Sequence, residues 1–198
     1  MSTFELYYSH PYKTDFEADI ISIDACDTEK STYKVILNQT LFFPEAGGQS
    51  CDKGEIILGN ITTAVESVQI DKEGIITHYI HSSSPLDTKS LVDTGIKGRI
   101  DWEHRFSNMQ QHSGEHIFSG IVHEKYGYDN VGFHLSDNSV TMDYNGYLSP
   151  DDVAGIEALV NKVIADNVGI DCSFPKDNEL ESIDYRCKGE LTGDIRIV

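Results

Sequence analysis

The stretch DWEHRFSNMQQHSGEHIFSGIVHEKYG, residues 101–127, predicts a long helix that presents two histidines on one face. An aspartate and a glycine at its ends can cap it, so we expect the helix to span roughly 102–126. His112 and His116 are four residues apart, which places their Cβ atoms about 5–6 Å from each other. Imidazole is a common zinc ligand, and a zinc ion with an open coordination position activates water. The sequence therefore favours a metal-assisted hydrolase.

Two other interpretations use the same residues. Histidines at this spacing also occur as half-buried helical side chains that bind no metal. The order His112-x-x-Glu115-His116 matches an inverted zinc-protease motif, in which Glu115 would be the general base. Such proteases need a further acidic ligand on another helix. Outside such a site, we expect Glu115 to be a solvated charge on the helix face.

Composition limits the class of protein. The chain has 198 residues, which is enough for one large domain or two small ones. Its hydrophobic content of 39% is typical of a folded protein. We expect no membrane span, because no apolar run approaches the roughly 18 residues that one needs. The N-terminus lacks a basic region followed by an apolar core, so we expect no signal peptide. Four scattered cysteines without a C-x-x-C pair favour a reducing, cytoplasmic location.

The formal net charge of −18 argues against broad electrostatic binding to nucleic acid, and we expect no DNA partner. Phosphate contacts need Lys and Arg, and these residues gather locally near the predicted helix. Arg99 and Arg105 belong to this basic group, together with Lys97 and Lys125. A small RNA-binding patch therefore remains compatible with the acidic chain.

Residues 1–95 predict a small β-barrel. Short alternating segments at 18–24, 33–37, 54–58 and 75–81 are separated by turn-forming residues. His78 and His81 lie in or just after the last segment, and we expect both on the surface, with an accessory role in the site as the alternative. Between strands, Gly47 and Gly48 allow a loop to approach a ligand or another backbone closely.

Residues 96–198 predict a second domain in which helices cover one face of an antiparallel sheet. Strands are expected at 131–135 and 139–144, and Ser149 can cap a helix that begins at Pro150 and runs to about residue 167. A strand near 169–173, a short helix near 177–183 and a strand at 194–198 follow. The whole chain is therefore expected to be α+β.

Taken together, several segments resemble the AlaX family of freestanding alanyl-tRNA editing proteins, which are related to the editing domain of alanyl-tRNA synthetase. The matching stretches are TLFFPEAGGQ (40–49), GRIDWEHR (98–105), MQQHSGEH (109–116), VGFHL (131–135), YR (185–186) and GDIRIV (193–198). The resemblance implies a barrel joined to the editing fold shared by alanyl- and threonyl-tRNA synthetases. It also implies hydrolysis in trans of mischarged Ser-tRNA(Ala), and sometimes Gly-tRNA(Ala), by a zinc-containing aminoacyl-tRNA deacylase.

The same resemblance implies roles for individual residues. His112 and His116 match the first two zinc ligands, and Thr40 matches a threonine that hydrogen-bonds the serine hydroxyl. The remaining matches are Gln111 beside the reaction, Gly47, Gly48, Gln49 and His134 at the substrate, and Arg99 and Arg105 at the tRNA. Thr40→Val should then impair deacylation far more than folding. Ala46 replaces a usual glycine of the family, which changes the expected flexibility of that loop.

One element of the family pattern lies outside this sequence. The family completes its zinc site with a Cys-x-x-x-His element just beyond the strand that ends here at Val198. With two histidines alone, we expect weak zinc binding or a shell filled by water. Cys172 and Cys187 are alternative ligands, although a buried structural thiol is the expected role of each. Two other functions stay open: a metal-dependent hydrolase of another small ester or amide, and a non-catalytic binding module.

Overall fold

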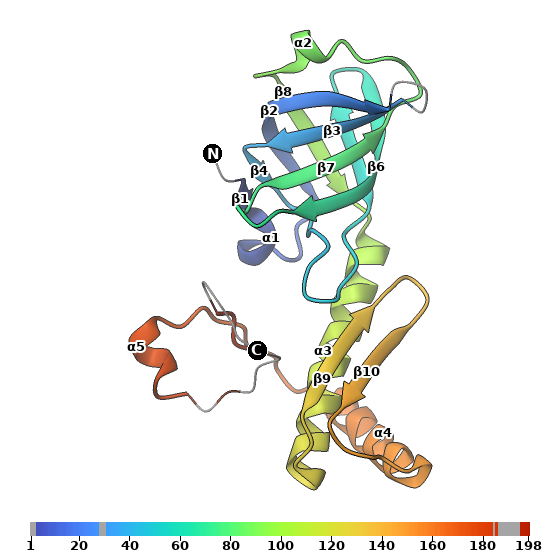
Figure 1. Cartoon of the computed structure of the whole chain (residues 1–198), viewed down its shortest axis with the longest axis vertical. Helices are drawn as coiled ribbons and strands as arrows, with labels where there is room; N and C mark the ends of the chain where they lie inside the picture. Colours follow the sequence, from blue (N-terminus) through green and yellow to red (C-terminus); the bar gives the residue numbers. More distant parts are fainter. Residues whose placement is uncertain (1–2, 28–30, 184, 186–194) are drawn as a thin grey trace. The chain divides into compact units, whose positions relative to one another are not determined.

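The computed structural model describes residues 3–27, 31–183, 185 and 195–198 (Figure 1). Two compact units divide the chain, Met1–Met109 and Gln110–Val198. The first contains β1 (Phe4–Glu5), α1 (Leu6–Ser9), β2 (Asp15–Asp27), β3 (Thr32–Leu37), β4 (Gln39–Thr40), β5 (Gly54–Leu58), β6 (Ile61–Ile70), β7 (Ile76–His81), α2 (Thr88–Leu91) and β8 (Gly95–Ile100). After α3 (Trp102–Tyr126), which crosses the division, come β9 (Asn130–Leu135), β10 (Val140–Tyr144), α4 (Pro150–Ala165) and α5 (Asp177–Leu180).

The first unit is built around a closed antiparallel barrel with the strand order β2-β3-β7-β6-β5-β8. β8 closes it by pairing with β2 on one side and β5 on the other, so that Gly98 lies opposite both Phe16 and Ile56. A Cβ atom at position 98 would lie 2.1 Å from the Phe16 ring. Glycine at this position therefore lets the ring pack across β8.

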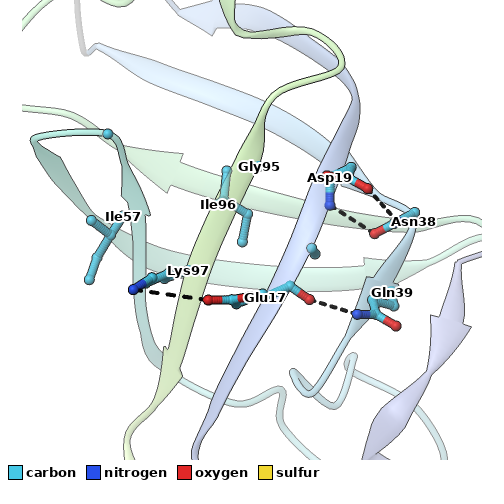
Figure 2. Close-up of a pocket in the computed structure, with 10 residues that line it drawn as sticks. Glu17, Asp19, Asn38, Gln39, Ile57, Gly95, Ile96 and Lys97 are labelled. Carbon is cyan, nitrogen blue, oxygen red and sulfur yellow. Dashed lines mark hydrogen bonds and ion pairs between the residues drawn. The ribbon is translucent and has the colours of Figure 1, made fainter.

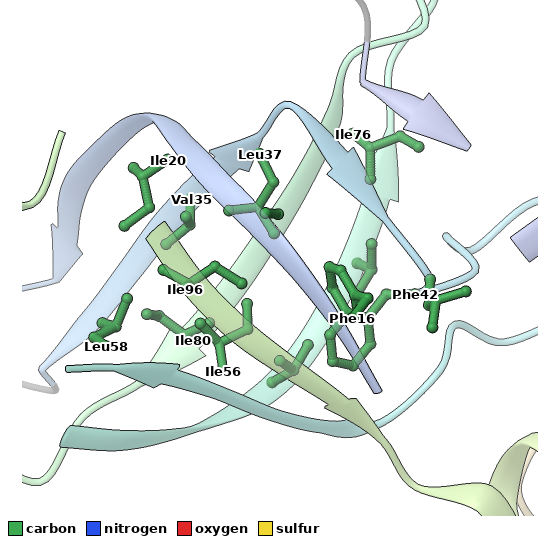
Figure 3. Close-up of a cluster of buried hydrophobic side chains, with 14 of the residues drawn as sticks. Phe16, Ile20, Val35, Leu37, Phe42, Ile56, Leu58, Ile76, Ile80 and Ile96 are labelled. Atoms are coloured by element: carbon green, nitrogen blue, oxygen red, sulfur yellow. The ribbon is translucent and has the colours of Figure 1, made fainter. Parts of the chain in front are cut away.

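Alternating side chains fill the barrel interior (Figure 3). Strand residues project to opposite faces in turn. Most inward positions of β3, β5, β7 and β8 are aliphatic, and Tyr33, His78 and Gly98 are the exceptions. The fully or almost fully buried members of this core include Phe16, Ile20, Val35, Leu37, Phe42, Ile56, Leu58, Ile76, Ile80 and Ile96. Phe16 and Phe42 meet edge to face with their centroids 5.8 Å apart. The predicted barrel is confirmed.

The barrel extends further along the chain than expected. Its last strand is β8, and the buried positions Ile96 and Ile100 point into the core. The expected division at 95/96 therefore falls inside a barrel strand, and the first unit includes the start of α3. β6 was also not expected, because a register shift between Val65 and Ser67 interrupts its alternation.

In the second unit, α3 packs with the antiparallel β9–β10 pair and with α4. Both predicted α3 caps are present: Asp101 Oδ1 accepts the His104 N–H at 3.1 Å, and Gly127 has a φ of +68°. α4 begins with the predicted cap, where Ser149 and Asp152 exchange hydrogen bonds. The α+β class is confirmed by the barrel, the second antiparallel sheet and these helices.

The C-terminal elements are shorter than expected. The strand expected near 169–173 is a single bridge between Ser173 and Ile197, and the helix expected near 177–183 is the one-turn α5. The start of the expected strand at 194–198 lies outside the described residues, as does Cys187. Cys172 is exposed, so the expected buried thiol is wrong for this residue. In the described part of the chain, no helix has the length and apolar character needed to cross a membrane.

Candidate functional site

Thr40, which was expected to contact the serine hydroxyl, is completely buried in the barrel unit. Its Oγ1 lies 2.9 Å from Nε2 of His78 and accepts a hydrogen bond from the backbone N–H of Phe42 at 3.0 Å. On the other side of the imidazole, Nδ1 of His78 lies 3.2 Å from the carbonyl oxygen of Val35. A short chain of polar contacts therefore fixes the Thr40 side chain.

The expected surface position of His78 is wrong, because its side chain is completely buried. His78 alternates along β7 with Ile76 and Ile80, which also point inward, whereas His81 is exposed as expected. The ring meets Phe42 edge to face at 5.7 Å. Burial lowers the pKa of His78 to about 4, although its hydrogen bond to Val35 acts in the opposite direction. The ring is therefore neutral at pH 7.

The glycine-containing loop makes a tight turn. Ala46 and Gln49 exchange backbone hydrogen bonds of 3.2 and 3.0 Å, and the two residues between them, Gly47 and Gly48, have φ values of +60° and +82°. Positive φ at both central positions is typical of a type I′ turn. The two glycines are exposed and Gln49 is buried. The backbone N–H of Glu45 holds this loop to β6 through the carbonyl of Val68 at 2.8 Å.

Arg105 was expected to contact tRNA, but its side chain is buried in an ion pair with Asp52. Its Nε lies 2.8 and 3.0 Å from the two carboxylate oxygens, and Nη2 also donates to Asp52. The remaining donors reach the carbonyl oxygens of Pro11 at 3.0 Å and Leu41 at 2.5 Å. Arg105 therefore joins α3 to the barrel and is not available to a phosphate, which corrects the expectation.

Arg99, the other residue expected to contact tRNA, lies on the outer wall of the barrel. Its side chain is 61% exposed, and its Nε lies 3.0 Å from Asp15. It borders a shallow hollow of about 520 Å³ that it shares with Lys97 and Glu17. Figure 2 shows an overlapping hollow on this wall, where Lys97 pairs with Glu17 at 4.0 Å. Cations and carboxylates alternate here, so the net charge of this wall is small.

In the second unit, His112 and His116 face each other on α3. Their rings are nearly parallel, with centroids 5.0 Å apart and an angle of 12°. The ring of Phe133 on β9 also stacks with His112, with the two centroids 5.2 Å apart. One ligand atom from each histidine and one from Glu115 lie within 4.8 Å of one another. Two imidazoles and a carboxylate are a donor set that suits zinc, so these residues fit the expected metal.

Glu115 is buried rather than solvated, which corrects the expectation for this residue. Its Oε1 accepts hydrogen bonds from Ser119 Oγ and from Asn130 Nδ2, each at 2.6 Å. Ser119 also contacts the hydroxyl of Tyr144 at 2.9 Å. Side chains from α3, β9 and β10 therefore fix the carboxylate beside the histidine pair, as the outer partners of metal ligands commonly do.

Two further expected site residues have exposed side chains in the second unit. Gln111 precedes His112 on α3, and His134 lies on β9 next to Phe133. His134 pairs with Thr141 across the hairpin. These positions are compatible with contact to a substrate, and the expected roles of both residues stay predictions.

The sequence did not indicate the structural roles of three residues that organise these sites, which are His78, Glu115 and Asp52. His78 could have been found from its alternation with Ile76 and Ile80, which predicts an inward side chain. Glu115 and Asp52 were harder to find, because their partners come from distant segments of the chain.

A sequence profile of the family described as "tRNA synthetases class II (A)" matches residues 6–104, which include the whole barrel. The chain therefore belongs to this family. It is 32% identical to the alanyl-tRNA editing protein AlaX-L of Pyrococcus horikoshii over 83% of its own length and 39% of the relative's. It is also 32% identical to the alanine–tRNA ligase of Natronomonas pharaonis, over 92% of this chain and 19% of that enzyme.

The alanyl-tRNA editing protein Aarsd1 of Bos taurus is 26% identical over 94% of this chain and 43% of the relative. The chain thus spans less than half of the length of each of these three relatives. Its resemblance to freestanding alanyl-tRNA editing proteins is confirmed by the matches to AlaX-L and Aarsd1.

Proposed function

We propose that the chain hydrolyses the ester bond of mischarged Ser-tRNA(Ala), releasing serine and tRNA. The observation that carries the proposal is the grouping of His112, Glu115 and His116 within 4.8 Å in a relative of alanyl-tRNA editing proteins. Hydrolysis adds water across the bond between the serine carbonyl carbon and the ribose oxygen. Cytoplasmic tRNA(Ala) is the proposed partner, and Gly-tRNA(Ala) is a second proposed substrate.

We assign the metal to the α3 site. His112 and His116 would hold a zinc ion through imidazole nitrogens, and the Glu115 carboxylate is fixed close enough to complete the set. Bound zinc would supply a Lewis acid and lower the pKa of a coordinated water. The protein's own contribution is orientation, because Phe133 stacks on His112 while Ser119 and Asn130 hold Glu115.

Thr40 is the residue proposed to recognise the side chain of the substrate amino acid. A site that hydrogen-bonds a hydroxyl rejects an analogue without one by roughly 10⁴-fold or more, because a buried polar group would lose its partner. This is the discrimination needed to hydrolyse seryl-tRNA and spare alanyl-tRNA. Because Thr40 is buried, contact with a serine hydroxyl requires a local rearrangement of the residues that cover it.

The experiment measures deacylation of Ser-tRNA(Ala), Gly-tRNA(Ala) and Ala-tRNA(Ala) with and without a chelator. We expect rapid loss of serine, little loss of alanine, and inhibition by chelation that added zinc reverses. His116→Ala should abolish turnover. His123→Ala is the matched control, because His123 is an exposed histidine on the same helix. Absence of deacylation with all three tRNAs would contradict the proposal.

A further inference from the structure

The buried Thr40–His78 pair has a defined hydrogen-bond direction. Nδ1 of His78 faces the carbonyl oxygen of Val35, which can only accept a hydrogen bond. A proton must therefore lie on Nδ1. The other ring nitrogen, Nε2, then carries a lone pair in the neutral imidazole. Nε2 lies 2.9 Å from Oγ1 of Thr40, so the Thr40 hydroxyl donates its single proton to His78.

This direction determines what Thr40 can offer to a ligand. A hydroxyl has one proton and two lone pairs. The proton is directed at His78, and the backbone N–H of Phe42 occupies one lone pair at 3.0 Å. Among the described residues, no further hydrogen bond uses the second lone pair. Toward a ligand, Thr40 can therefore act only as a hydrogen-bond acceptor.

We infer that His78 is a positioning residue that makes Thr40 an acceptor for the side-chain hydroxyl of the substrate amino acid. The inference rests on the proposed function, in which Thr40 contacts serine. Serine can donate to this acceptor, whereas alanine has no side-chain donor. Glycine has none either, so hydrolysis of Gly-tRNA(Ala) would not depend on this contact. His78 does not touch the substrate and acts through Thr40.

Burial keeps this direction constant. His78 is completely enclosed and packs edge to face against Phe42, so rotation of the ring is opposed by the surrounding core. The opposite ring tautomer would place a lone pair against the Val35 carbonyl in a buried site. That arrangement leaves two acceptors facing each other and costs free energy that the observed arrangement avoids.

The first experiment observes His78 directly. A long-range ¹H–¹⁵N NMR spectrum of the full chain, labelled in its histidine rings, reports which ring nitrogen carries the proton. The His78 ring signals are assigned as those that disappear from the spectrum of His78→Phe. We expect them to report the Nδ1–H tautomer. An Nε2–H tautomer would overturn the inference, whatever the activity of the protein.

The second experiment tests specificity with three variants. His78→Phe retains an aromatic ring but removes the acceptor, and we expect the ratio of Ser-tRNA(Ala) to Ala-tRNA(Ala) deacylation to fall about 10-fold, the factor that one typical hydrogen bond supplies. His78→Gln offers a carbonyl oxygen to Thr40 and should restore the ratio. His81→Phe, the same change at the exposed end of β7, should leave it unaltered.

The outcomes separate the inference from the proposed function. Equal losses for both tRNAs in His78→Phe, with an unchanged ratio, would show a purely structural role and overturn the inference. If the wild-type chain hydrolyses none of the tRNAs, the proposed function fails and the recognition role of Thr40 fails with it. The NMR spectrum still reports the direction of the hydrogen bond in that case.

Discussion

Arg105 near the start of α3 and Asp52 between β4 and β5 form a buried ion pair whose two side chains are 5% and 0% exposed. The carboxylate also accepts the backbone N–H of Phe43 at 2.6 Å. Removal of either charge would leave the other uncompensated in the interior. This pair is therefore a structural link within the first unit.

Asp52→Ala should destabilise the protein by about 3–5 kcal/mol, because it leaves the Arg105 guanidinium buried without its anion. The measurement is the free energy of unfolding from urea denaturation. The matched control is Asp15→Ala, which removes the exposed partner of Arg99 and should cost less than about 1 kcal/mol. Equal effects of the two changes would contradict the structural role of the buried pair.

Thr40→Val should affect both activity and stability, in contrast to the expectation from sequence. The change removes the partner of His78 Nε2 and of the Phe42 N–H, so a cost of about 1–3 kcal/mol in unfolding free energy is expected. Deacylation of Ser-tRNA(Ala) by the folded fraction should also fall. Thr40→Ser retains the hydroxyl and should preserve most of both properties. Full activity of folded Thr40→Val would remove Thr40 from the mechanism.

Acid should destabilise the protein through His78. Its pKa is about 4 in the folded chain, below the value of about 6.5 in an unfolded one. The unfolded chain therefore binds the proton more readily than the folded chain. The contribution of neutral His78 to the unfolding free energy is fully present above pH 6.5 and is lost as the pH falls toward 4. The total loss is on the order of 3 kcal/mol.

The measurement is urea denaturation of wild type and His78→Phe at several pH values between 7.5 and 4.5. The difference between their unfolding free energies should shrink or reverse in favour of the variant as pH falls. A constant difference across this range would rule out a depressed pKa for His78.

Zinc affinity should depend on the residues that hold Glu115. Asn130→Ala removes one of the two hydrogen bonds to Oε1 and should weaken zinc binding about 10-fold, as loss of outer partners does at other metal sites. Isothermal titration of the metal-free protein with zinc measures this directly. Asn145→Ala, at an exposed asparagine just after β10, is the control. Unchanged affinity in Asn130→Ala would separate Glu115 from the metal site.

Arg99 should contribute to tRNA binding without supporting the fold. Arg99→Ala should reduce the slope of log affinity for tRNA against log salt concentration by about 1, which corresponds to the loss of one phosphate contact. It should leave the unfolding free energy almost unchanged. Filter binding of uncharged tRNA(Ala) at several salt concentrations measures the slope. Lys162→Ala, which removes another exposed cation with a carboxylate partner, serves as the control. An unaltered slope in Arg99→Ala would exclude Arg99 from the tRNA contact.

Local patterns predicted the elements that depend on nearby residues. The bounds of α3 followed from Asp101 and Gly127, because helix caps act within one turn. The barrel followed from alternation, although β8 lay beyond its expected bounds and a register shift in β6 hid a second strand. The pairing of His112 with His116 also followed from helical spacing, and the structure places their rings face to face.

Contacts between distant segments were not predictable in the same way. The sequence predicts an exposed cation at Arg105, because no nearby residue indicates a buried partner. The partner is Asp52, which is 53 residues earlier in the chain. Glu115 likewise depends on Asn130, which reaches it from β9. In both cases a charge can be buried only because a residue from a distant segment supplies its partner. The local sequence pattern does not indicate which residue that partner is.

Closure of the barrel by β8 has a consequence for how the chain folds. β2 begins at Asp15, but one of its edges pairs with β8, the last strand of the barrel. In this pairing Asp15 lies opposite Arg99. During synthesis, each paired residue of β2 must wait for its partner on β8, which is between 76 residues (Asp19 and Gly95) and 84 residues (Asp15 and Arg99) further along the chain. Pairing over such a long separation is slow, and an uncovered edge invites association with other chains. The nascent protein therefore carries an unpaired strand edge until its sixth barrel strand has left the ribosome.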